Sequence, residues 1–517
     1  MLKPLKILHT AKIGAIEDGI LRFNNITAII EPKNLINYCK RSLRGFYIYT
    51  FDDKYLNYFV GKKIDNITIK TVYSNSTIMF VKLTSKRNIL TIVNASFMFP
   101  KQPPNLFNAL FYLYNTLGKG ILPSYTPATF ALRLWRLKFQ KEALRGISFL
   151  SDRIIRQAYA GGRSEIIKSK LNKGYYYDIN SMYADMMRKD MPVGRICGTL
   201  TRTEGAIGFY KCEVNQSKMN LPPLWQKIHN DIKSKDMLCF PKDEFIGIFD
   251  GDEIDNAIKV GTEVKILGGI EWEDKKPIFK EFIEYLYDLR EKTQFEWFEA
   301  FLKKVLVSFY GKFAENKDDY RQVVQCKDIK NYNNYINDDN NKTSIIDDDN
   351  LIIEVAKKIV KYNRNNYNLP HFSAHIAALG RIEIYNQAIK ADAAYIETDA
   401  LFTSKKLKTG TKLGNWKLIG KIKNAEFKLC KTYSYEMDGK TNYVAAGISD
   451  KADKSVYFQG ESIKIYKKQK FIEEKKEYNM KMKNTGFIKR DIHDNFSLGL
   501  TIQEILNRMK INNPLFA

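Results

Sequence analysis

The sequence predicts an α+β fold divided into several domains. Apolar and polar residues alternate with the period of a β-strand in 19–32 and 74–95. In 278–315 and 371–390 apolar residues recur every three to four positions, which predicts helices. A chain of 517 residues can form several domains with a large core. Strand-rich and helix-rich stretches in one such chain therefore predict a mixed, multidomain architecture.

The charge balance predicts a polyanionic partner. The 83 Lys and Arg residues outnumber the 58 Asp and Glu residues and leave a net charge of +25. Nucleic acid and an anionic membrane surface both attract such a surplus. The 31 tyrosines and 31 phenylalanines favour nucleic acid, because bases stack on aromatic rings. A Lys-rich coding bias of the genome is the alternative explanation of the charge.

Three further features predict an intracellular protein that does not enter a membrane. No run of about 18 apolar residues is present. The opening MLKPLKILHTAKIG has no long apolar segment with the small-residue cleavage site of a secretory signal. The six cysteines include no CxxC pair, so we expect neither a disulfide framework nor a zinc ribbon.

The first half of the chain alternates between strand and helix patterns. Residues 1–150 contain short strands and helices. A helical stretch over 141–163 breaks at Gly161 and Gly162. Residues 193–275 then combine short strands with one helix.

The second half begins with a long helical pattern. That pattern breaks near Lys292–Gln294, which predicts an antiparallel helix pair, and it stops at Gly311. Asn and Asp dominate 316–350, which predicts a loop or hairpin insertion. Residues 393–403 form a predicted hairpin with acids at its tip. The last 85 or so residues are strand-like and then Lys-rich and helical.

Carboxylates at the ends of two apolar strands are the first candidate site. Asp178 follows the aromatic run 174–177, and Glu397 and Asp399 are spaced i,i+2, which predicts that they share one face of a strand. Two bare carboxylates about 4 Å apart repel by roughly 4 kcal/mol at an effective dielectric near 20. A cluster of this kind is stable when cations bridge it, and oxygen ligands favour Mg²⁺ or Mn²⁺. A pair of such ions catalyses in-line phosphoryl transfer. Ordinary acids in turns are the alternative interpretation.

A helix face supplies the second candidate. Lys303, Val307 and Tyr310 are spaced i, i+4 and i+7 and therefore lie on one face. A cation and an aromatic hydroxyl there suit a triphosphate and its base or sugar. Arg290, on the preceding helix, adds a second potential phosphate contact. An amphipathic helix with solvated lysines is the alternative.

These residues lie in three motifs that resemble those of family B DNA polymerases. The stretch 178–183, DINSMY, resembles motif A, and 303–311, KKVLVSFYG, resembles motif B. The stretch 395–400, YIETDA, resembles motif C. The three occur in the order A, B, C that the family has.

Further stretches narrow the resemblance to the protein-primed branch of bacteriophages, other viruses and linear plasmids. YAGG at 159–162 resembles the Tyr-x-Gly-Gly linker of that branch. KLGNW at 412–416 and KTY at 431–433 resemble its two motifs after motif C. The interval between motifs A and B has room for the first terminal-protein-region insertion, and 316–350 lies where the second belongs.

The resemblance implies a right-hand fold of palm, fingers and thumb behind a degenerate ribonuclease-H-like domain. The implied parts are the exonuclease-like domain at 1–150, the linker and first part of the palm at 151–192, the first insertion at 193–276, the fingers at 277–315, the second insertion at 316–350, the remaining palm at 351–433 and the thumb at 434–517.

It also implies roles for individual residues. The catalytic carboxylates are Asp178, Asp399 and Glu397, with Asp178 and Asp399 as ligands of two Mg²⁺ or Mn²⁺ ions. Tyr183 lies flat beneath the incoming sugar, where it excludes a 2′-hydroxyl. The implied dNTP contacts are Tyr183, Lys303, Tyr310, Arg290 and Met182. The implied DNA contacts are Ser181, Tyr159, Gly161, Gly162, Gly311, Lys431, Tyr433 and Lys412.

Several positions depart from the family pattern. Ala184 replaces a proline in motif A, Val307 an asparagine in motif B, and Ala400 a serine in motif C. Glu397 replaces the first aspartate of motif C and reaches farther. None of these changes removes a ligand that the chemistry requires. The HxxxH pair His371 and His375 is interpreted as part of a packed helix, not as a zinc site.

The first domain lacks the acids that a proofreading exonuclease needs. His9 and Ala11 stand where the first strand should carry acids, and Asn94 and Asn108 lie near later acid positions. Without carboxylates there are no bound metals and no hydrolysis. We therefore expect a DNA-binding wall without proofreading. The remaining nearby acids are Glu17, Asp18, Asp52 and Asp53.

The sequence thus predicts a template-directed DNA polymerase that adds dNMP to a 3′-hydroxyl. Its expected partners are template and primer DNA, dNTPs and a terminal protein that primes synthesis with strand displacement. We expect a monomer in the cytoplasm of a host cell, encoded by a virus or mobile element. A specialised repair, lesion-bypass or primer-independent polymerase is the first alternative, and an inactive DNA-binding scaffold is the second.

Overall fold

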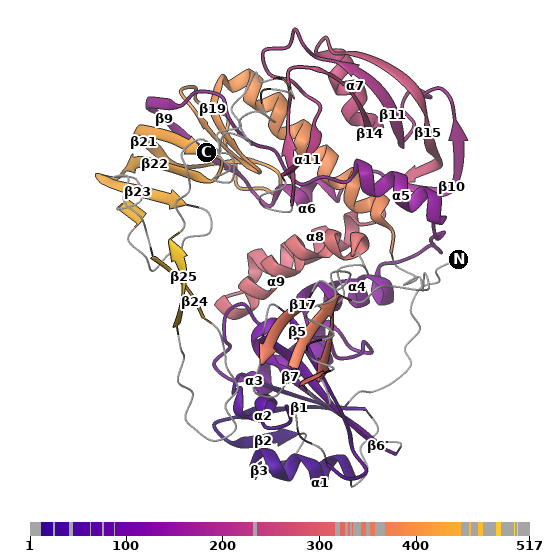
Figure 1. The fold of residues 1–517 in the computed structure, drawn as a ribbon, viewed down its shortest axis with the longest axis vertical. Coiled ribbons are helices and arrows are strands. Elements are labelled where there is room, and N and C mark those ends of the chain that lie inside the picture. The colour runs from indigo at the N-terminus through magenta and orange to yellow at the C-terminus, as the bar shows by residue number, and fades with distance from the viewer. Residues whose placement is uncertain are drawn as a thin grey trace.

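A computed structural model describes residues 12–315 and 368–445, apart from 24–25, 41–44, 61, 63, 75–76, 87 and 231–234, together with short pieces of 321–356 and 454–504. In Figure 1 a sheet of N-terminal strands lies at one end of the molecule and a layer of helices lies across the middle. Two further sheets lie at the other end. None of the helices in the described part of the chain has the length and apolar character of a membrane span.

Seven N-terminal strands form one sheet in the order β3-β2-β1-β4-β7-β6-β5. Strand β1 runs parallel to β4, and β4 runs parallel to β7. Parallel neighbours require crossover connections, and short helices lie in these connections. The strands are β1 Lys12–Glu17, β2 Ile20–Phe23, β3 Ile26–Ile29, β4 Phe46–Thr50, β5 Thr68–Ser74, β6 Thr77–Ser85 and β7 Asn88–Asn94, and the helices are α1 Leu35–Lys40 and α2 Lys54–Asn57.

The two faces of this sheet pack against different cores. Ile16, Ile48 and Ile92 belong to a small cluster on one face. Their neighbours Tyr49 and Val93 belong to the main core of the molecule. Successive residues of a strand point to opposite faces, so the central strands are buried on both sides.

A layer of helices connects this sheet to the rest of the molecule. Trp135 packs against Phe279 and Phe309, with ring centroids 5.1 Å and 6.0 Å away. The predicted break of the helix pair near 292–294 is confirmed, because α8 ends at Lys292 and α9 begins at Glu296. The helices are α3 Leu106–Phe111, the π-helix Tyr112–Leu117, α4 Pro127–Lys138, α8 Lys280–Lys292, α9 Glu296–Phe309 and the 3-10 helix Tyr310–Ala314.

A second seven-stranded sheet carries the candidate site, in the order β23-β22-β21-β9-β20-β19-β8. The predicted hairpin at 393–403 is confirmed as β19 and β20. Helix α11 is buried at every residue from Pro370 to Arg381. The strands are β8 Ser164–Ile166, β9 Lys170–Ile179, β19 Ala393–Glu397, β20 Ala400–Thr403, β21 Trp416–Leu429, β22 Thr432–Met437 and β23 Lys440–Ala445, and the helices are α6 Met182–Met186 and α11 Pro370–Ala391.

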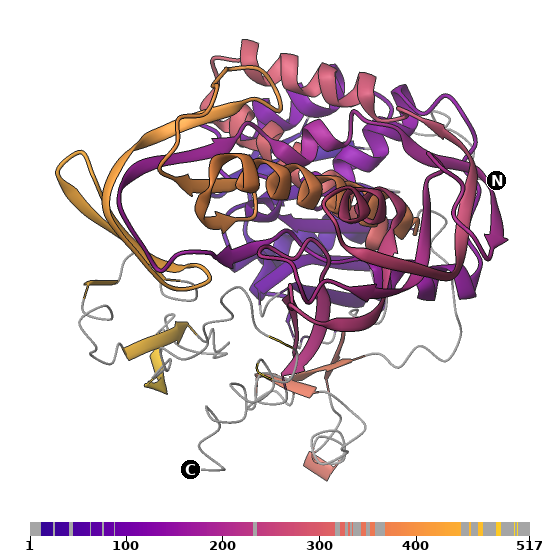
Figure 2. The ribbon, with the colours of Figure 1, turned by 90° about the horizontal axis from the view of Figure 1, so that it is seen from above.

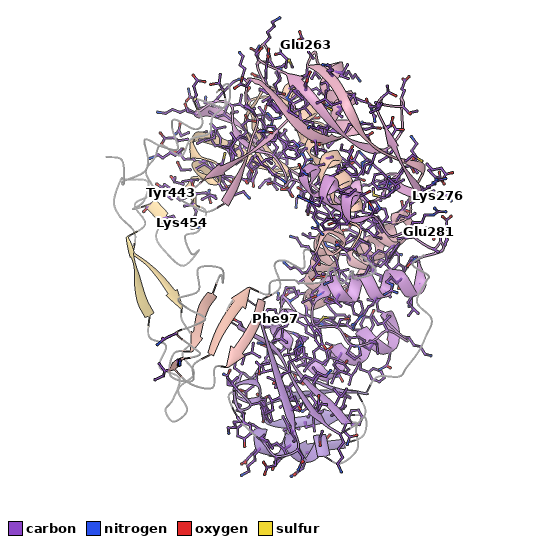
Figure 3. All side chains as sticks on the ribbon, turned by 45° about the vertical axis from the view of Figure 1, so that its right-hand side comes forward. Phe97, Glu263, Lys276, Glu281, Tyr443 and Lys454 are labelled. Atoms are coloured by element: carbon purple, nitrogen blue, oxygen red, sulfur yellow. The ribbon has the colours of Figure 1, made fainter. Side chains whose placement is uncertain are left out.

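A four-stranded sheet in the order β10-β15-β11-β14 lies beside α11 (Figure 2). Its longest strand runs from Glu263 to Lys276, and the latter end lies near Glu281 of α8 (Figure 3). The elements of this region are α5 Phe149–Ala158, β10 Met191–Thr199, β11 Gly208–Asn215, β12 Gln226–Asn230, β13 Lys235–Cys239, β14 Glu244–Asp250, α7 Gly251–Lys259 and β15 Glu263–Lys276.

The remaining described strands form two small sheets. One has the order β16-β18-β17, and the other pairs β24 with β25. Most of the predicted Lys-rich C-terminal helix and of the Asn/Asp-rich insertion lies outside the described residues. These strands are β16 Arg321–Gln325, β17 Thr343–Asp347, β18 Ile352–Ala356, β24 Lys464–Lys468 and β25 Met482–Phe487.

Candidate active site

Two carboxylates from distant parts of the chain lie side by side, one at the end of a strand and one in the turn before the neighbouring strand. Asp178 on β9 pairs directly with Ala400 on β20, so Asp399 is its neighbour across the sheet. The backbone N–H of Ile179 donates to the carbonyl oxygen of Asp399 at 2.9 Å. The sheet therefore brings together the two acids that the sequence singled out.

The turn between β19 and β20 differs from the predicted arrangement of Glu397 and Asp399. Glu397 pairs with Ala400, so Thr398 and Asp399 form a two-residue turn. Thr398 has φ 56°, in the left-handed region, and the Asp399 N–H donates to the Glu397 carbonyl at 2.6 Å. The prediction that both acids share one face of a strand is wrong, because this turn rotates the backbone between them.

The environment of the two acids opposes their ionisation. Burial raises the pKa of Asp178 to about 6, and the charge of Asp399 adds to the rise. Burial also raises the pKa of Asp399. The positive charge of Lys303 acts in the opposite direction on both groups. Two half-buried oxygen donors that repel each other fit a hard divalent cation, which would neutralise them together.

Glu397 is held by its neighbours. Its carboxylate accepts hydrogen bonds from the Ser164 hydroxyl, at 3.2 Å, and from the Tyr395 hydroxyl. The Lys431 ammonium lies 3.6 Å from one of its oxygens, and the Lys431 backbone N–H donates to Tyr395. Glu397 thus ties the turn between β19 and β20 to β8 and to the start of β22.

An aromatic pair lies beside these acids. The rings of Tyr183 and Tyr310 are stacked, with centroids 4.9 Å apart and planes 22° apart. Burial is the largest cause of the rise in the pKa of Tyr183 to about 12, and it also raises the pKa of Tyr310. Both phenols are therefore neutral at physiological pH. Tyr183 comes from motif A and Tyr310 from motif B, so the stack joins segments about 130 residues apart.

The helix pair presents its charged residues toward this area. Lys303 and Val307 are exposed on α9, as the spacing predicts. Arg290 of α8 donates to the Ser181 hydroxyl at 3.3 Å and pairs with Glu299 at the same distance. Glu299 belongs to α9, so this ion pair links the Arg290 guanidinium of α8 to the second helix of the pair.

The linker at 159–162 is fixed by a buried arginine that the sequence analysis did not single out. One nitrogen of Arg381, Nη1, donates to the carbonyls of Ala160 and Gly161 at 2.8 and 2.9 Å. Its other nitrogens bind Glu253 of α7 at 2.7 and 2.9 Å. An arginine within an otherwise apolar helix pattern was the available signal, because a buried charge needs a partner.

A second missed arginine, Arg163, follows the linker. It is fully buried, binds Glu165 at 2.8 Å and donates to the Pro222 carbonyl at 2.9 Å. Its own carbonyl accepts from the Thr398 N–H at 2.7 Å. The linker is thereby hydrogen-bonded to the turn that carries Asp399.

The other predicted site residues have varied surroundings. Met182 and Tyr433 are 1% and 4% exposed, and each packs within an apolar cluster. Tyr159 and Gly162 are half-buried. The exposed members of the predicted set are Gly161, Gly311, Lys412 and Lys431.

A further group of potential metal ligands contains none of the predicted site residues. Donor atoms of Asp250, Asp252 and His375 lie within 4.8 Å of one another. His375 Nδ1 is 2.8 Å from Asp250, and its Nε2 is 3.2 Å from the Asp190 carbonyl. Asp250 also caps α7 by accepting from the Asp252 N–H at 2.9 Å. Hydrogen bonds within the fold account for this cluster.

The N-terminal sheet shows where the candidate exonuclease positions lie. Asn94 is buried, donates to the Ile78 carbonyl at 3.0 Å and caps the turn after β7. Glu17 ends β1 and accepts from the Leu106 N–H at 2.7 Å. Strand β1 begins at Lys12, so His9 and Ala11 lie outside the described residues. Asn108 belongs to α3, and Asp52 and Asp53 follow β4.

Comparison with known proteins identifies the family. Residues 32–406 match the model of DNA polymerase type B, organellar and viral. The chain belongs to this family, which confirms the resemblance seen in the motifs.

Its curated relatives are fungal. A probable DNA polymerase of Podospora anserina is 24% identical over 62% of this chain and 29% of that protein. One from Agaricus bitorquis is 24% identical over 63% of this chain and 45% of that protein, and one from Ascobolus immersus is 28% identical over 54% and 24%. The chain spans less than half the length of each of these relatives.

Solved structures share the fold. Phi29 DNA polymerase in complex with primer-template DNA and incoming nucleotide substrates has a TM-score of 0.63 and 16% identity over 84% of this chain and 89% of that one. The same enzyme with single-stranded DNA has a TM-score of 0.61 and 15% identity over 89% and 97%. The chain therefore has the mixed α+β fold of phi29 polymerase over most of its length.

Proposed function

We propose that this protein is a template-directed DNA polymerase. One observation carries the proposal: Asp178 on β9 pairs with Ala400, so it lies beside the β19–β20 turn that carries Asp399, next to the Tyr183–Tyr310 stack and within the field of Lys303. In the reaction a primer 3′-hydroxyl attacks the α-phosphorus of a dNTP. A new P–O bond forms, the bond to pyrophosphate breaks, and the hydroxyl loses its proton.

Asp178 and Asp399 would hold two Mg²⁺ or Mn²⁺ ions. Bound ions of this kind supply positive charge to the attacking and leaving oxygens. The raised pKa of Asp178, near 6, supports this assignment, because a cation relieves the repulsion that raises it. Glu397 orients the turn through its hydrogen bonds with Ser164 and Tyr395, and its carboxylate would contribute a further oxygen.

Residues of this chain would bind the nucleotide around those acids. Lys303 contacts the triphosphate. Arg290 makes a second contact with the triphosphate after its guanidinium separates from Ser181 and Glu299. Tyr183 lies beneath the sugar and excludes a 2′-hydroxyl. Tyr310 supports the Tyr183 ring by stacking on it. Met182 is buried and would act by holding Tyr183 in place.

The DNA strands would follow the linker and the residues after motif C. Tyr159, Gly161 and Gly162 would guide the template, and Lys412 and Lys431 are exposed for phosphate contacts. Tyr433 would support the primer side from within its cluster. The remaining proposed contacts are Ser181 and Gly311. With a net charge of +25, affinity for DNA should fall with salt at a log–log slope near −0.9 for each phosphate neutralised.

The domains predicted from the sequence carry over into this proposal. The sheet with Asp178 is the palm, and it extends past the predicted boundary at 433 because β22 and β23 belong to it. Helices α8 and α9 are the fingers, and the thumb follows β23. The sheet of β10, β11, β14 and β15 corresponds to the first terminal-protein-region insertion. It supports protein-primed synthesis, in which a hydroxyl of a terminal protein takes the place of the primer end.

The proposal includes the absence of proofreading. Asn94 uses its amide to hydrogen-bond Ile78 and to cap a turn, and Glu17 is bound by Arg22 and Leu106. Single-stranded DNA should therefore not be shortened when Mg²⁺ is supplied without dNTPs. The same observation favours a repair or lesion-bypass polymerase as the second candidate function.

Primer extension tests the central claim. The unmodified protein with Mg²⁺, dNTPs and a primed template should extend the primer, and Asp178→Asn or Asp399→Asn should abolish extension. Asp392→Asn is the matched control, because Asp392 is an exposed residue at the other end of the same hairpin strand and asparagine tolerates its left-handed φ of 49°. Extension that survives Asp399→Asn would refute the site. A requirement for a terminal protein with dATP would separate protein priming from the second candidate.

A further inference from the structure

The hydroxyl of Tyr183 lies against the backbone of Gly162. A Cβ atom placed on Gly162 would lie 2.7 Å from the Tyr183 hydroxyl oxygen and 2.6 Å from Cγ2 of Thr398. Both distances are shorter than van der Waals contact, so a side chain at 162 and the Tyr183 ring cannot occupy their present positions together.

One face and one edge of the Tyr183 ring are also covered. Tyr310 covers one face of the ring. A Cβ on Gly380 of α11 would lie 3.3 Å from the Tyr183 Cε1 atom and 3.1 Å from Met182 Cε. Two glycines, on the linker and on α11, therefore form a slot in which the ring is held at its tip and along one edge.

The linker cannot readily move away to widen this slot. Arg381 holds the carbonyls of Ala160 and Gly161, and Glu253 holds Arg381, with both side chains buried. On the other side of Gly162, the Arg163 carbonyl accepts from Thr398. Gly162 is thus anchored on both sides, and the Tyr183 ring has to yield to any added atom.

We propose that Gly162 is a specificity-determining position of the nucleotide site, because its lack of a side chain sets where the Tyr183 ring lies and so how strongly dNTP is favoured over rNTP. This inference rests on the proposed function, in which Tyr183 excludes the 2′-hydroxyl. Gly162 is a positioning residue for sugar selection: it acts on the nucleotide through Tyr183 and not by direct contact with it.

Displacement of the Tyr183 ring in either direction lowers the discrimination between dNTP and rNTP. A ring moved away from the nucleotide leaves room for a 2′-hydroxyl, so rNTP incorporation rises. A ring moved toward the nucleotide collides with both sugars, so dNTP loses its advantage. The ratio of kcat/KM for dNTP to that for rNTP therefore falls, and a rise in KM for dNTP identifies the second case.

The experiment compares two adjacent glycines. In a Thr398→Ser background, which removes the Cγ2 contact, Gly162→Ala should lower the dNTP/rNTP ratio by about tenfold or more. Gly161→Ala is the matched control, because a Cβ there meets nothing within 4 Å and its φ is not in the left-handed region. The control should leave the sugar ratio unchanged, whatever it does to DNA affinity.

A rescue variant separates positioning from a general structural defect. Tyr183→Phe removes the oxygen that the added Cβ would meet, so Gly162→Ala combined with Tyr183→Phe should change the ratio by less than about twofold relative to Tyr183→Phe alone. Gly380→Ala approaches the same ring from a helix, where alanine is favoured over glycine by about 1 kcal/mol. It should fold and should lower the ratio by a smaller factor than Gly162→Ala.

The outcomes are distinguishable. If the unmodified protein incorporates no dNTP, the proposed function fails. If it incorporates dNTP and the ratio is the same in Gly162→Ala, Gly161→Ala and Gly380→Ala, the inference about Gly162 is wrong and the proposed function stands. A fall that Gly162→Ala causes equally with and without Tyr183→Phe would also overturn it.

Discussion

Arg381 and Glu253 form a bidentate ion pair in the interior of the protein. The Nε and Nη2 atoms of Arg381 lie 2.7 and 2.9 Å from the two carboxylate oxygens, and the two side chains are 3% and 4% exposed. The pair joins α11 to α7, and the remaining guanidinium nitrogen binds the linker. It therefore connects three parts of the fold that meet near Tyr183 of the candidate site.

Removal of Arg381 should destabilise the protein strongly. Arg381→Ala leaves Glu253 buried without its charge partner, which typically costs about 3–5 kcal/mol in the free energy of unfolding. Urea denaturation followed by circular dichroism would measure the loss. Lys292→Ala is the control, because Lys292 and its partner Asp288 are 72% and 57% exposed and such pairs contribute less than about 1 kcal/mol. Similar losses in both variants would contradict the assignment.

Lys303→Ala should raise the KM for dNTP more than it changes kcat. A charge-assisted contact of about 1.5–3 kcal/mol corresponds to roughly a 10- to 100-fold weaker grip on the triphosphate. Steady-state incorporation at fixed salt and saturating DNA measures the effect. Lys304→Ala serves as the control, because Lys304 is the adjacent exposed lysine and points from a different side of α9. A KM that rises equally in both variants would show a general loss of charge.

His371 should make the protein less stable in acid. Burial lowers its pKa from 6.5 to about 3, and its Nδ1 atom has no hydrogen-bond partner among the described residues. The folded protein keeps this ring neutral, whereas the unfolded chain binds a proton below about pH 6.5. The contribution of His371 to stability is therefore present above that pH and is lost as the pH falls toward 3.

His371→Phe tests this pH dependence. Phenylalanine keeps a ring to stack on Trp272, whose centroid is 4.9 Å away, and it cannot be protonated. Between about pH 7.5 and 5.0 the unmodified protein should lose about 2 kcal/mol more unfolding free energy than the variant. Parallel curves for the two proteins would show that His371 does not titrate in this way.

Gly414→Ala should cost more stability than Gly439→Ala. Both glycines have left-handed φ, 80° and 73°, so each substitution carries a backbone penalty of about 1–2 kcal/mol. A Cβ on Gly414 would also overlap the carboxyl group of Asp185, whereas one on Gly439 meets nothing within 4 Å. Thermal unfolding compares the two, and equal shifts in Tm would show that Asp185 yields freely.

Gly414 also links the stretch 412–416 to motif A. Its N–H donates to the Asn180 carbonyl at 2.9 Å, and the Asn180 N–H donates to the Asn415 carbonyl at 2.9 Å. Gly414→Ala should therefore lower polymerisation as well as stability, because the loop with Lys412 is placed by these bonds beside motif A.

Local sequence patterns predicted the helices and strands of this fold more accurately than they predicted the contacts between them. The helix pair and the β19–β20 hairpin follow from periodicity and from breaks that neighbouring residues determine. The face shared by Lys303 and Val307 was predicted for the same reason. The i,i+2 argument for Glu397 and Asp399 failed, because the strand ends at Glu397 and Thr398 enters a turn with left-handed φ. The N–H of Thr398 donates to Arg163, a contact far away in sequence.

The partners of the buried arginines could not be predicted from the sequence. Arg381 lies 128 positions from Glu253, and Arg163 donates to a carbonyl 59 positions away. Such partners are chosen by tertiary packing, which one sequence does not reveal. The motif resemblance identified Gly162 but not its contact with Tyr183, because that contact depends on the positions of β8, α6 and the turn at Thr398.

Helix α11 is enclosed along its whole first half, from Pro370 to Arg381. It touches β19 and β20, β10 and β14 of the four-stranded sheet, and helix α6. A rod surrounded in this way cannot slide or tilt unless all of its neighbours move with it. If the protein opens and closes around a substrate, this packing predicts that the movement takes place away from α11, for example at the connection between α8 and α9 that contains the exposed Phe295.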